Sequence, residues 1–335
     1  MDVRAPVRHW RPDSGPGAVF GDRDAALALL RTAALASRGL NGKGVNVVVV
    51  DQGLDGSRIP AKNYGGIIWR QHPYVATPRS SDHGMMVVRN ILSVAPEATI
   101  FDCHLVPPTI SNPRQFASTA ADAYRDMTDD IANAAKGLPP GPWIFVNAWA
   151  VYSRALESAA DNYTNNPDHA FNRIIGETVQ THGRDVIFAA GNCGEFYPNP
   201  RCGSDDCGPG RSIHGANAHP RVITAGAVRT DGVWIGSSSQ GPGPANMARE
   251  KPDLCAPSQF RETGDAFAIN TGTSTACGLV AGVVAALRTT TSTSGLREPP
   301  GELKARLLAT ARRGAGAGWD HRLGYGILDV EAALA

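Results

Sequence analysis

Three residues that together can make a nucleophile are spread along this 335-residue chain as Asp51, His83 and Ser274. A serine hydroxyl is a weak nucleophile at neutral pH, so it needs a base within hydrogen-bond reach and an acid that orients the base. We predict that Ser274 is the nucleophile, His83 its general base and Asp51 the orienting acid. Each residue also has a structural interpretation: Asp51 as an acid in a turn, His83 as a polar residue at a helix start, and Ser274 as a helix N-cap.

Each of these residues stands where a regular element is expected to begin or end. Asp51 closes the apolar run Val47–Val50, whose lack of alternation predicts a buried parallel strand, and catalytic groups gather at the carboxyl edge of such sheets. His83 opens an apolar run, residues 83–94, that predicts a helix. Ser274 opens a long run of small residues. It therefore lies at a helix N-terminus, where unpaired N–H groups and the helix dipole favour an oxyanion.

Strand-like and helical patterns alternate along the chain, which predicts an α/β fold with a mainly parallel central sheet and helices on both faces. We expect an N-terminal arm and helix over residues 1–41 and one domain over residues 42–335. The first helix is expected over residues 22–38 with Asp22 as its cap, and residues 53–79 are expected to be a polar connection. The other expected strands are 98–105, 143–150, 186–192 and 222–228; the other expected helices are 118–137, 170–182 and 301–311; residues 251–257 are expected to be a loop.

Charge and hydropathy argue against several classes of partner. The formal net charge is +1 and there is no basic run, so we expect no nucleic-acid partner. No segment approaches the roughly 18 apolar residues of a membrane span, so we expect no membrane partner. No apolar stretch follows the charged residues of the N-terminus, so we expect a cytoplasmic rather than a secreted protein. We expect a monomer or an association with an unidentified partner protein.

Four motifs around these residues resemble those of subtilisin-like serine proteases, and the resemblance runs from about residue 42 to residue 335. It implies a subtilisin-like three-layer architecture, a peptide or protein substrate, and the Asp51, His83 and Ser274 triad. It also implies that Asn192 donates its side-chain N–H to the developing oxyanion, although the residues alone also fit an asparagine in a turn. The motifs are Val-Val-Asp-Gln-Gly at 49–53, Asp-His-Gly at 82–84, Ala-Ala-Gly-Asn at 189–192 and Gly-Thr-Ser-Thr-Ala at 272–276.

The substrate-binding strand departs from the family pattern, because Trp149-Ala150-Val151 replaces its Ser-Leu-Gly. The resemblance implies that the substrate pairs with these three residues through β-augmentation, and we also expect Gly191 in the substrate site. A Trp149 side chain that turns into the first pocket predicts a preference for a small residue before the scissile bond, whereas one that turns outward would form part of a lid. Two further departures, Met85 and the segment 275–279, remove no catalytic group.

The six cysteines leave several interpretations open. Three cysteines lie in apolar or small-residue settings and are expected to be buried thiols: Cys103, Cys255 and Cys277. The other three, Cys193, Cys202 and Cys207, cluster in a polar loop. There we expect free thiols, a disulfide with Cys202 and Cys207 as the nearest pair, or a zinc site with His214.

Calcium is possible as a cofactor by resemblance, with Glu195, Asp205 and Asp206 as candidate ligands, although no EF-hand-like spacing supports it. The predicted function is a serine endopeptidase that acts through an acyl-enzyme on Ser274. Two alternatives remain: a processing or transpeptidating enzyme of the same fold, and a peptide-binding pseudoprotease.

Overall fold

The computed structural model describes residue 15 and residues 17–70, 82–107, 112–155, 157, 162–263, 265–313 and 318–335. Most of the expected arm and the last part of the polar connection before His83, residues 71–79, lie outside the described residues. Among the described helices, none is long and apolar enough to cross a membrane.

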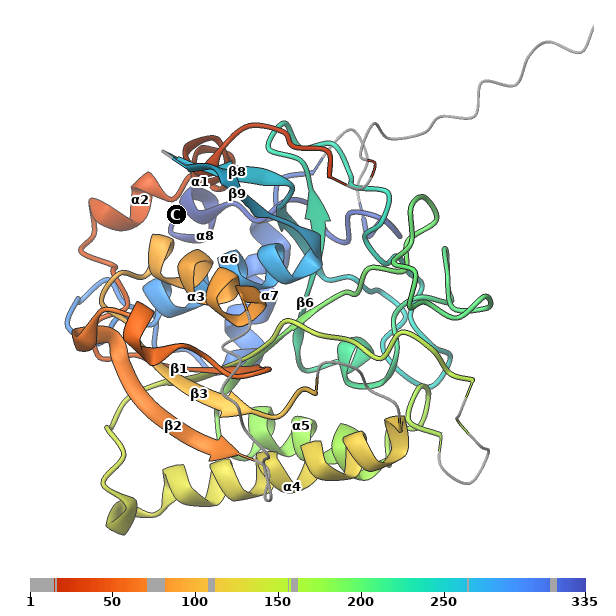
Figure 1. Cartoon of the computed structure of the whole chain (residues 1–335). Helices are drawn as coiled ribbons and strands as arrows, with labels where there is room; N and C mark the ends of the chain where they lie inside the picture. The colour runs from red at the N-terminus through yellow and green to blue at the C-terminus, as the bar shows by residue number, and fades with distance from the viewer. Residues whose placement is uncertain are drawn as a thin grey trace, which may run out of the picture.

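A seven-stranded parallel sheet runs through the centre of the molecule, which confirms the predicted fold class (Figure 1). Its middle strands β1 (Asn46–Asp51) and β4 (Trp143–Asn147) consist mainly of β-branched and aromatic residues that are buried on both faces, as expected for a covered parallel sheet. Asp51 ends the third strand in the spatial order, opposite His104 of the neighbouring strand. In spatial order the strands are β2 (Tyr64–Arg70), β3 (Thr99–His104), β1 (Asn46–Asp51), β4 (Trp143–Asn147), β5 (Asp185–Ala189), β6 (Ile223–Val228) and β7 (Leu254–Pro257).

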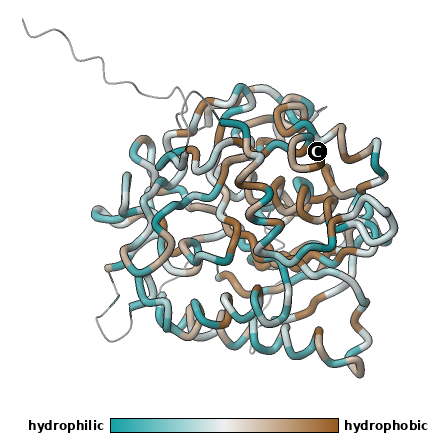
Figure 2. The backbone as a smooth tube through the Cα atoms, turned by 180° about the vertical axis from the view of Figure 1, so that it is seen from behind, coloured by the Kyte–Doolittle hydropathy of each residue, from teal (hydrophilic) through white to brown (hydrophobic). Residues whose placement is uncertain are grey.

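Helices cover both faces of this sheet and give two hydrophobic cores (Figure 1). Alternate residues of β1 divide between them: Val47 and Val49 face the core of α3 (Asp82–Val94) and α6 (Gly272–Leu287), while Val48 and Val50 face the other core. The second core is covered by α4 (Pro113–Ala132) and α5 (Ala170–Gln180). Seen from behind, the apolar segments gather in the middle of the molecule (Figure 2).

The helix that carries Ser274 packs unusually close to the helix that carries His83. A Cβ atom at Gly278 would lie 2.9 Å from the Asn90 Cβ atom, and one at Gly282 would lie 2.8 Å from the Ile91 carbonyl oxygen. Glycine is therefore required at both positions of α6, and the small-residue pattern of this helix brings the two catalytic helices together.

Several expected boundaries were wrong for identifiable reasons. Strand β2 occupies part of the expected polar connection, because an edge strand with alternating exposure has no continuous apolar run. The expected first helix is capped by Asp22 as predicted, but it breaks where Arg31 adopts φ 58°, which leaves α1 (Arg23–Leu30) and α2 (Ala33–Ala36). Strand β7 lies in the segment expected to be a loop. The remaining elements are β8 (Phe260–Glu262) and β9 (Asp265–Asn270), which are antiparallel, α7 (Pro300–Thr310) and α8 (Val330–Ala333).

Candidate active site

The acid and the base lie where β1 ends and α3 begins. The Asp51 side chain is buried, and its carboxylate oxygens lie 2.8 and 3.2 Å from His83 Nδ1. Asp51 Oδ1 also accepts a 2.8 Å hydrogen bond from the Gln52 backbone N–H. A Cβ atom at Gly84 would lie 2.8 Å from a Leu54 methyl group, so glycine next to the histidine allows this helix to start close to the strand.

Ser274 lies in the first turn of α6 and completes the hydrogen-bonded series. Its Oγ lies 3.0 Å from His83 Nε2 and 2.8 Å from the Ala148 carbonyl oxygen. A hydroxyl has one proton, so Ser274 donates to only one of these acceptors at a time. Donation to His83 is the arrangement that prepares the oxygen for attack.

Two opposing effects set the pKa of His83. Burial lowers it, and the charge and hydrogen bond of Asp51 raise it more strongly. The positive charge of Arg201 lowers it by a smaller amount, and the net result is a pKa above the ordinary value of 6.5. The site therefore stabilises the imidazolium that forms when the serine gives up its proton.

The Asn192 amide is held with its oxygen at the start of α6 and its nitrogen at Tyr152. Its Oδ1 accepts hydrogen bonds from the backbone N–H of Thr273, at 2.9 Å, and from the Thr273 hydroxyl, at 3.1 Å. Its Nδ2 donates to the Tyr152 hydroxyl at 3.0 Å. Gly272, with φ +70°, allows this approach, because a Cβ atom there would lie 3.1 Å from Asn192 Nδ2.

A cleft of about 600 Å³ opens over these groups. Its volume and its mixture of apolar walls and convergent polar groups are typical of a substrate site. The described residues that line it are Asp51, Gln52, His83, Val106, Pro107, Pro113, Ala148, Trp149, Ala150, Val151, Tyr152, Ser153, Asn192, Asn199, Arg201, Thr271, Gly272 and Ser274.

The expected substrate-binding residues are divided between the cleft and the core. Ala150 and Val151 line the cleft, whereas Gly191 is not among its described lining residues and has φ +106°. Trp149 contributes to the cleft wall but packs mainly into the core, where its ring centroid lies 5.0 Å from that of Phe116. Contrary to expectation, the Trp149 ring therefore neither fills the pocket nor forms a lid. It belongs to an aromatic cluster behind residues 149–151 that also contains Phe171 and Phe188.

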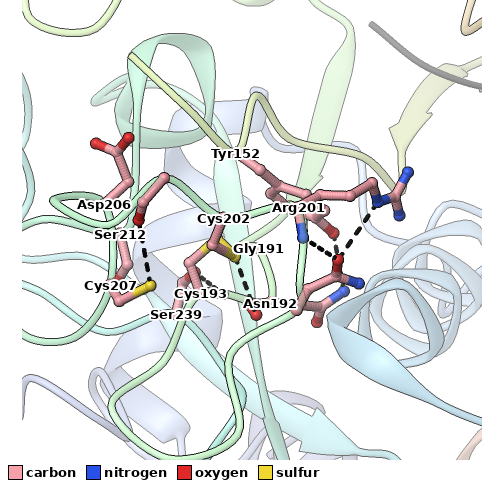
Figure 3. Close-up of a disulfide and its surroundings, with 12 residues drawn as sticks. Tyr152, Gly191, Asn192, Cys193, Arg201, Cys202, Asp206, Cys207, Ser212 and Ser239 are labelled. Carbon is pink, nitrogen blue, oxygen red and sulfur yellow. Dashed lines mark hydrogen bonds between the residues drawn. A yellow bond between two sulfur atoms is a disulfide. The ribbon is translucent and has the colours of Figure 1, made fainter. Parts of the chain in front are cut away.

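Eleven of the described lining residues were not predicted, among them the polar residues Tyr152, Asn199 and Arg201 (Figure 3 labels Tyr152 and Arg201). Tyr152 directly follows the predicted substrate-binding residues 149–151, so its position was available from the sequence by extending that segment. Asn199 and Arg201 come from an irregular loop, where no periodicity indicates which side chains face the cleft.

The loop cysteines are paired differently from the nearest-pair expectation. Cys193 and Cys202 form a disulfide, and Cys207 is a free thiol (Figure 3). The short spacing between Cys202 and Cys207 was misleading, because the chain folds back between residues 193 and 202. The structure confirms buried free thiols at the three cysteines expected in apolar settings: Cys103, Cys255 and Cys277.

The candidate zinc and calcium ligands do not converge. The ring nitrogens of His214 lie 3.1 Å from the Val151 carbonyl oxygen and 2.8 Å from that of Arg211, so the expected zinc ligand is occupied. Asp206 pairs with Arg154, and Glu195 with Arg322. Within the described part of the chain, no three His, Cys, Asp or Glu side chains gather as a metal-binding group, so these residues do not fit calcium.

Comparisons with known proteins agree with this geometry. The sequence model of the subtilase family matches residues 42–326, while no curated protein sequence matches significantly. Two solved structures of MycP1 are similar. One, described as a serine protease of the type VII (ESX-1) secretion system, has a TM-score of 0.62 and 22% identity, and covers 97% of this chain and 96% of its own. The other, from Mycobacterium smegmatis, has a TM-score of 0.60 and 21% identity, and covers 97% and 92%.

The prenylagaramide maturation protease PagA is also similar, with a TM-score of 0.62, 19% identity, and coverage of 90% of this chain and 97% of that one. At these identities the solved structures support the fold, and the family model supplies the assignment. Because that model spans most of the sequence, the chain belongs to the subtilase family and is a serine-type peptidase.

Proposed function

We propose that this chain is an endopeptidase that hydrolyses peptide bonds through an acyl-enzyme on Ser274. The observation that carries the proposal is the hydrogen-bonded series from Asp51 through His83 to Ser274, with its 2.8 and 3.0 Å contacts, at the floor of a peptide-sized cleft. A pseudoprotease would need no such alignment of acid, base and nucleophile.

In the first step, His83 Nε2 takes the hydroxyl proton while Ser274 Oγ attacks the scissile carbonyl carbon. Negative charge then develops on the carbonyl oxygen, where Asn192 Nδ2 and the backbone N–H of Ser274 at the start of α6 are the available donors. His83 returns the proton to the leaving amine as the acyl-enzyme forms. A water molecule, activated by the same base, then releases the product acid.

Tyr152 has a place in this sequence because its hydroxyl lies at one N–H of the Asn192 amide. Burial raises the pKa of Tyr152, so the hydroxyl stays protonated at neutral pH. An amide nitrogen has two hydrogens, so the oxyanion can be bound through the second hydrogen or by displacing the tyrosine hydroxyl.

The proposal is tested by labelling with a fluorophosphonate probe and by peptide hydrolysis, with wild type compared with Ser274→Ala. Labelling and hydrolysis should both depend on Ser274, and mass spectrometry of the labelled protein should place the adduct on that residue. Hydrolysis that persists in Ser274→Ala after purification to homogeneity would reject the assignment.

A second candidate is a processing or transpeptidating peptidase, which the likeness in fold to the maturation protease PagA favours. Both candidates share the acyl-enzyme and differ only in whether water or an amine releases it. Mass spectrometry of products formed with an added amine nucleophile separates them: an amide product in excess over the acid identifies transpeptidation.

A further inference from the structure

The active-site cleft contains a formal charge that the triad does not use. Among the described residues that line the cleft, those of the types Asp, Glu, His, Lys and Arg are Asp51, His83 and Arg201. Asp51 is buried and pairs with His83, so neither group is available to pair with a charged substrate. Arg201 is exposed, and among the described residues no carboxylate forms an ion pair with it.

Arg201 is held beside the oxyanion donor by the backbone of its own loop. Its neighbour Cys202 is bonded to Cys193, which follows Asn192 directly. The Asn199 backbone N–H donates to the Asn192 carbonyl oxygen at 2.8 Å, and Asn199 Oδ1 accepts from the Arg201 backbone N–H at 3.0 Å. In Figure 3, Arg201 and Asn192 lie on the same side of the disulfide.

The guanidinium itself is also oriented. Arg201 Nε donates to Asn199 Oδ1 at 3.3 Å, and the Arg201 Cζ atom lies 5.3 Å from the centre of the Tyr152 ring. Such a position over an aromatic ring stabilises a cation and limits its rotamers. The effect of the Arg201 charge on the pKa of His83 also indicates that this charge lies within electrostatic reach of the reacting groups.

We propose that Arg201 selects substrates with a carboxylate side chain, Asp or Glu, on the residue whose carbonyl is attacked. This inference rests on the proposed function, because it names the substrate class of the same cleft. The scissile carbonyl oxygen binds at Asn192, whose amide nitrogen donates to Tyr152, and Arg201 lies against the Tyr152 ring. The substrate side chain branches at the Cα atom next to that carbonyl, so it is within reach of Tyr152 and Arg201. A guanidinium matches a carboxylate in geometry as well as charge, and it repels a Lys or Arg at the same position.

The test uses matched peptides that differ only at the residue before the scissile bond: Asp against Asn, Glu against Gln, and Lys. Ratios of kcat/KM within each enzyme variant cancel general effects on the chemistry. For wild type, the acid should exceed its amide isostere by about tenfold, a typical size for a hydrogen-bonded ionic contact, and the ratio should fall as salt is added.

Three variants separate a charge effect from a structural one. Arg201→Gln should bring the ratio of acid to amide to about one, and Arg201→Glu should invert it and improve cleavage after Lys. Arg211→Glu is the matched control, because Arg211 is an exposed arginine of the same loop outside the described cleft lining, and its ratio should stay at the wild-type value. A wild-type ratio near one, or an unchanged ratio in Arg201→Gln, would overturn the inference.

A second readout does not depend on turnover. The same peptides should protect Ser274 from the fluorophosphonate probe, and the Asp peptide should protect at about a tenfold lower concentration than the Asn peptide. Protection with this preference but without cleavage would support Arg201 as the selecting residue and reject the endopeptidase proposal. Equal protection by both peptides, with cleavage of both, would reject the role of Arg201 and leave the endopeptidase proposal in place.

Discussion

The two sides of the active-site cleft are built in different ways. On one side, Asp51, His83 and Ser274 lie at the end of β1 and in the first turns of α3 and α6. On the other side, Arg201 and Asn199 belong to residues 193–211, here called the disulfide loop, none of which lies in a helix or strand. The sheet and packed helices fix the first group, whereas a disulfide and local side-chain contacts hold the second.

This difference separates reactivity from selectivity. A triad loses its function when its members shift by about 1 Å, so its residues belong on elements whose backbone is fixed by many hydrogen bonds and by close packing. A specificity contact tolerates more movement, and a loop can change its residues without disturbing the core. We therefore expect changes at the ends of the regular elements to abolish catalysis, and changes in the disulfide loop to alter which peptides are cleaved.

The largest effect should come from the triad. Ser274→Ala and His83→Ala should each reduce kcat by several orders of magnitude; in subtilisin, a member of this family and the source of the number, the loss is about 10⁶. The double variant should be hardly slower than either single variant, because the two residues act as one unit. Single-turnover kinetics on one peptide measures all three, and losses that add would contradict a shared role.

A smaller loss of kcat should follow Asn192→Ala. Asn192 is the residue that joins the two sides of the cleft. Removing this donor should lower kcat by about 10²–10³ with little change in KM, a magnitude also known from subtilisin. Tyr152→Phe is the matched comparison, because it removes the hydroxyl bonded to Asn192 while Thr273 still anchors the amide oxygen. We expect less than about a tenfold loss there. Equal losses in both variants would make Tyr152 part of the oxyanion hole.

The rate should depend on one ionisation, that of His83. The neutral ring is the base, and Asp51 favours the protonated form, so activity should be lost as the pH falls through a pKa above 6.5. Below that pKa, kcat/KM should fall about tenfold per pH unit. Asp51→Asn should lower both the rate and the midpoint. A profile that is flat from about pH 5 to 9 would remove His83 from the role of base.

The smallest effect on catalysis should come from opening the disulfide loop. Cys193→Ser with Cys202→Ser should change kcat on a neutral peptide by less than about tenfold, because the triad does not depend on this loop. The same double variant should lower the free energy of unfolding by about 2–3 kcal/mol, from the entropy of a loop of this length. Urea unfolding measures the loss, with Cys207→Ser as the control.

The cysteine pairing has its own check. Wild type unfolded without reductant should titrate four thiols: Cys103, Cys207, Cys255 and Cys277. Six titrated thiols would mean that the disulfide is absent, and none would mean that the loop and core cysteines pair differently.

The sequence predicted five of the seven strands of the sheet, most of the helices and the residues of the candidate triad. Buried parallel strands require continuous apolar runs, and a serine nucleophile requires a base and an acid, so both leave recognisable patterns around Asp51, His83 and Ser274. The small residues of α6 were visible in the sequence, but the structure alone showed that they pack against α3. Strand β2 and the break at Arg31 escaped prediction, because an edge strand and a left-handed residue leave no periodic signal.

The tertiary structure alone decided how the cleft is finished. Cys193 pairs with Cys202 because the loop folds back on itself, although Cys207 is closer to Cys202 in sequence. Trp149 packs behind the substrate strand because Phe116 and Phe171, from two distant helices, provide an aromatic pocket there. Arg201 lies in the cleft for a similar reason: the contacts that place it join segments far apart in the chain or lie in irregular loops, and such contacts have no spacing that a sequence can reveal.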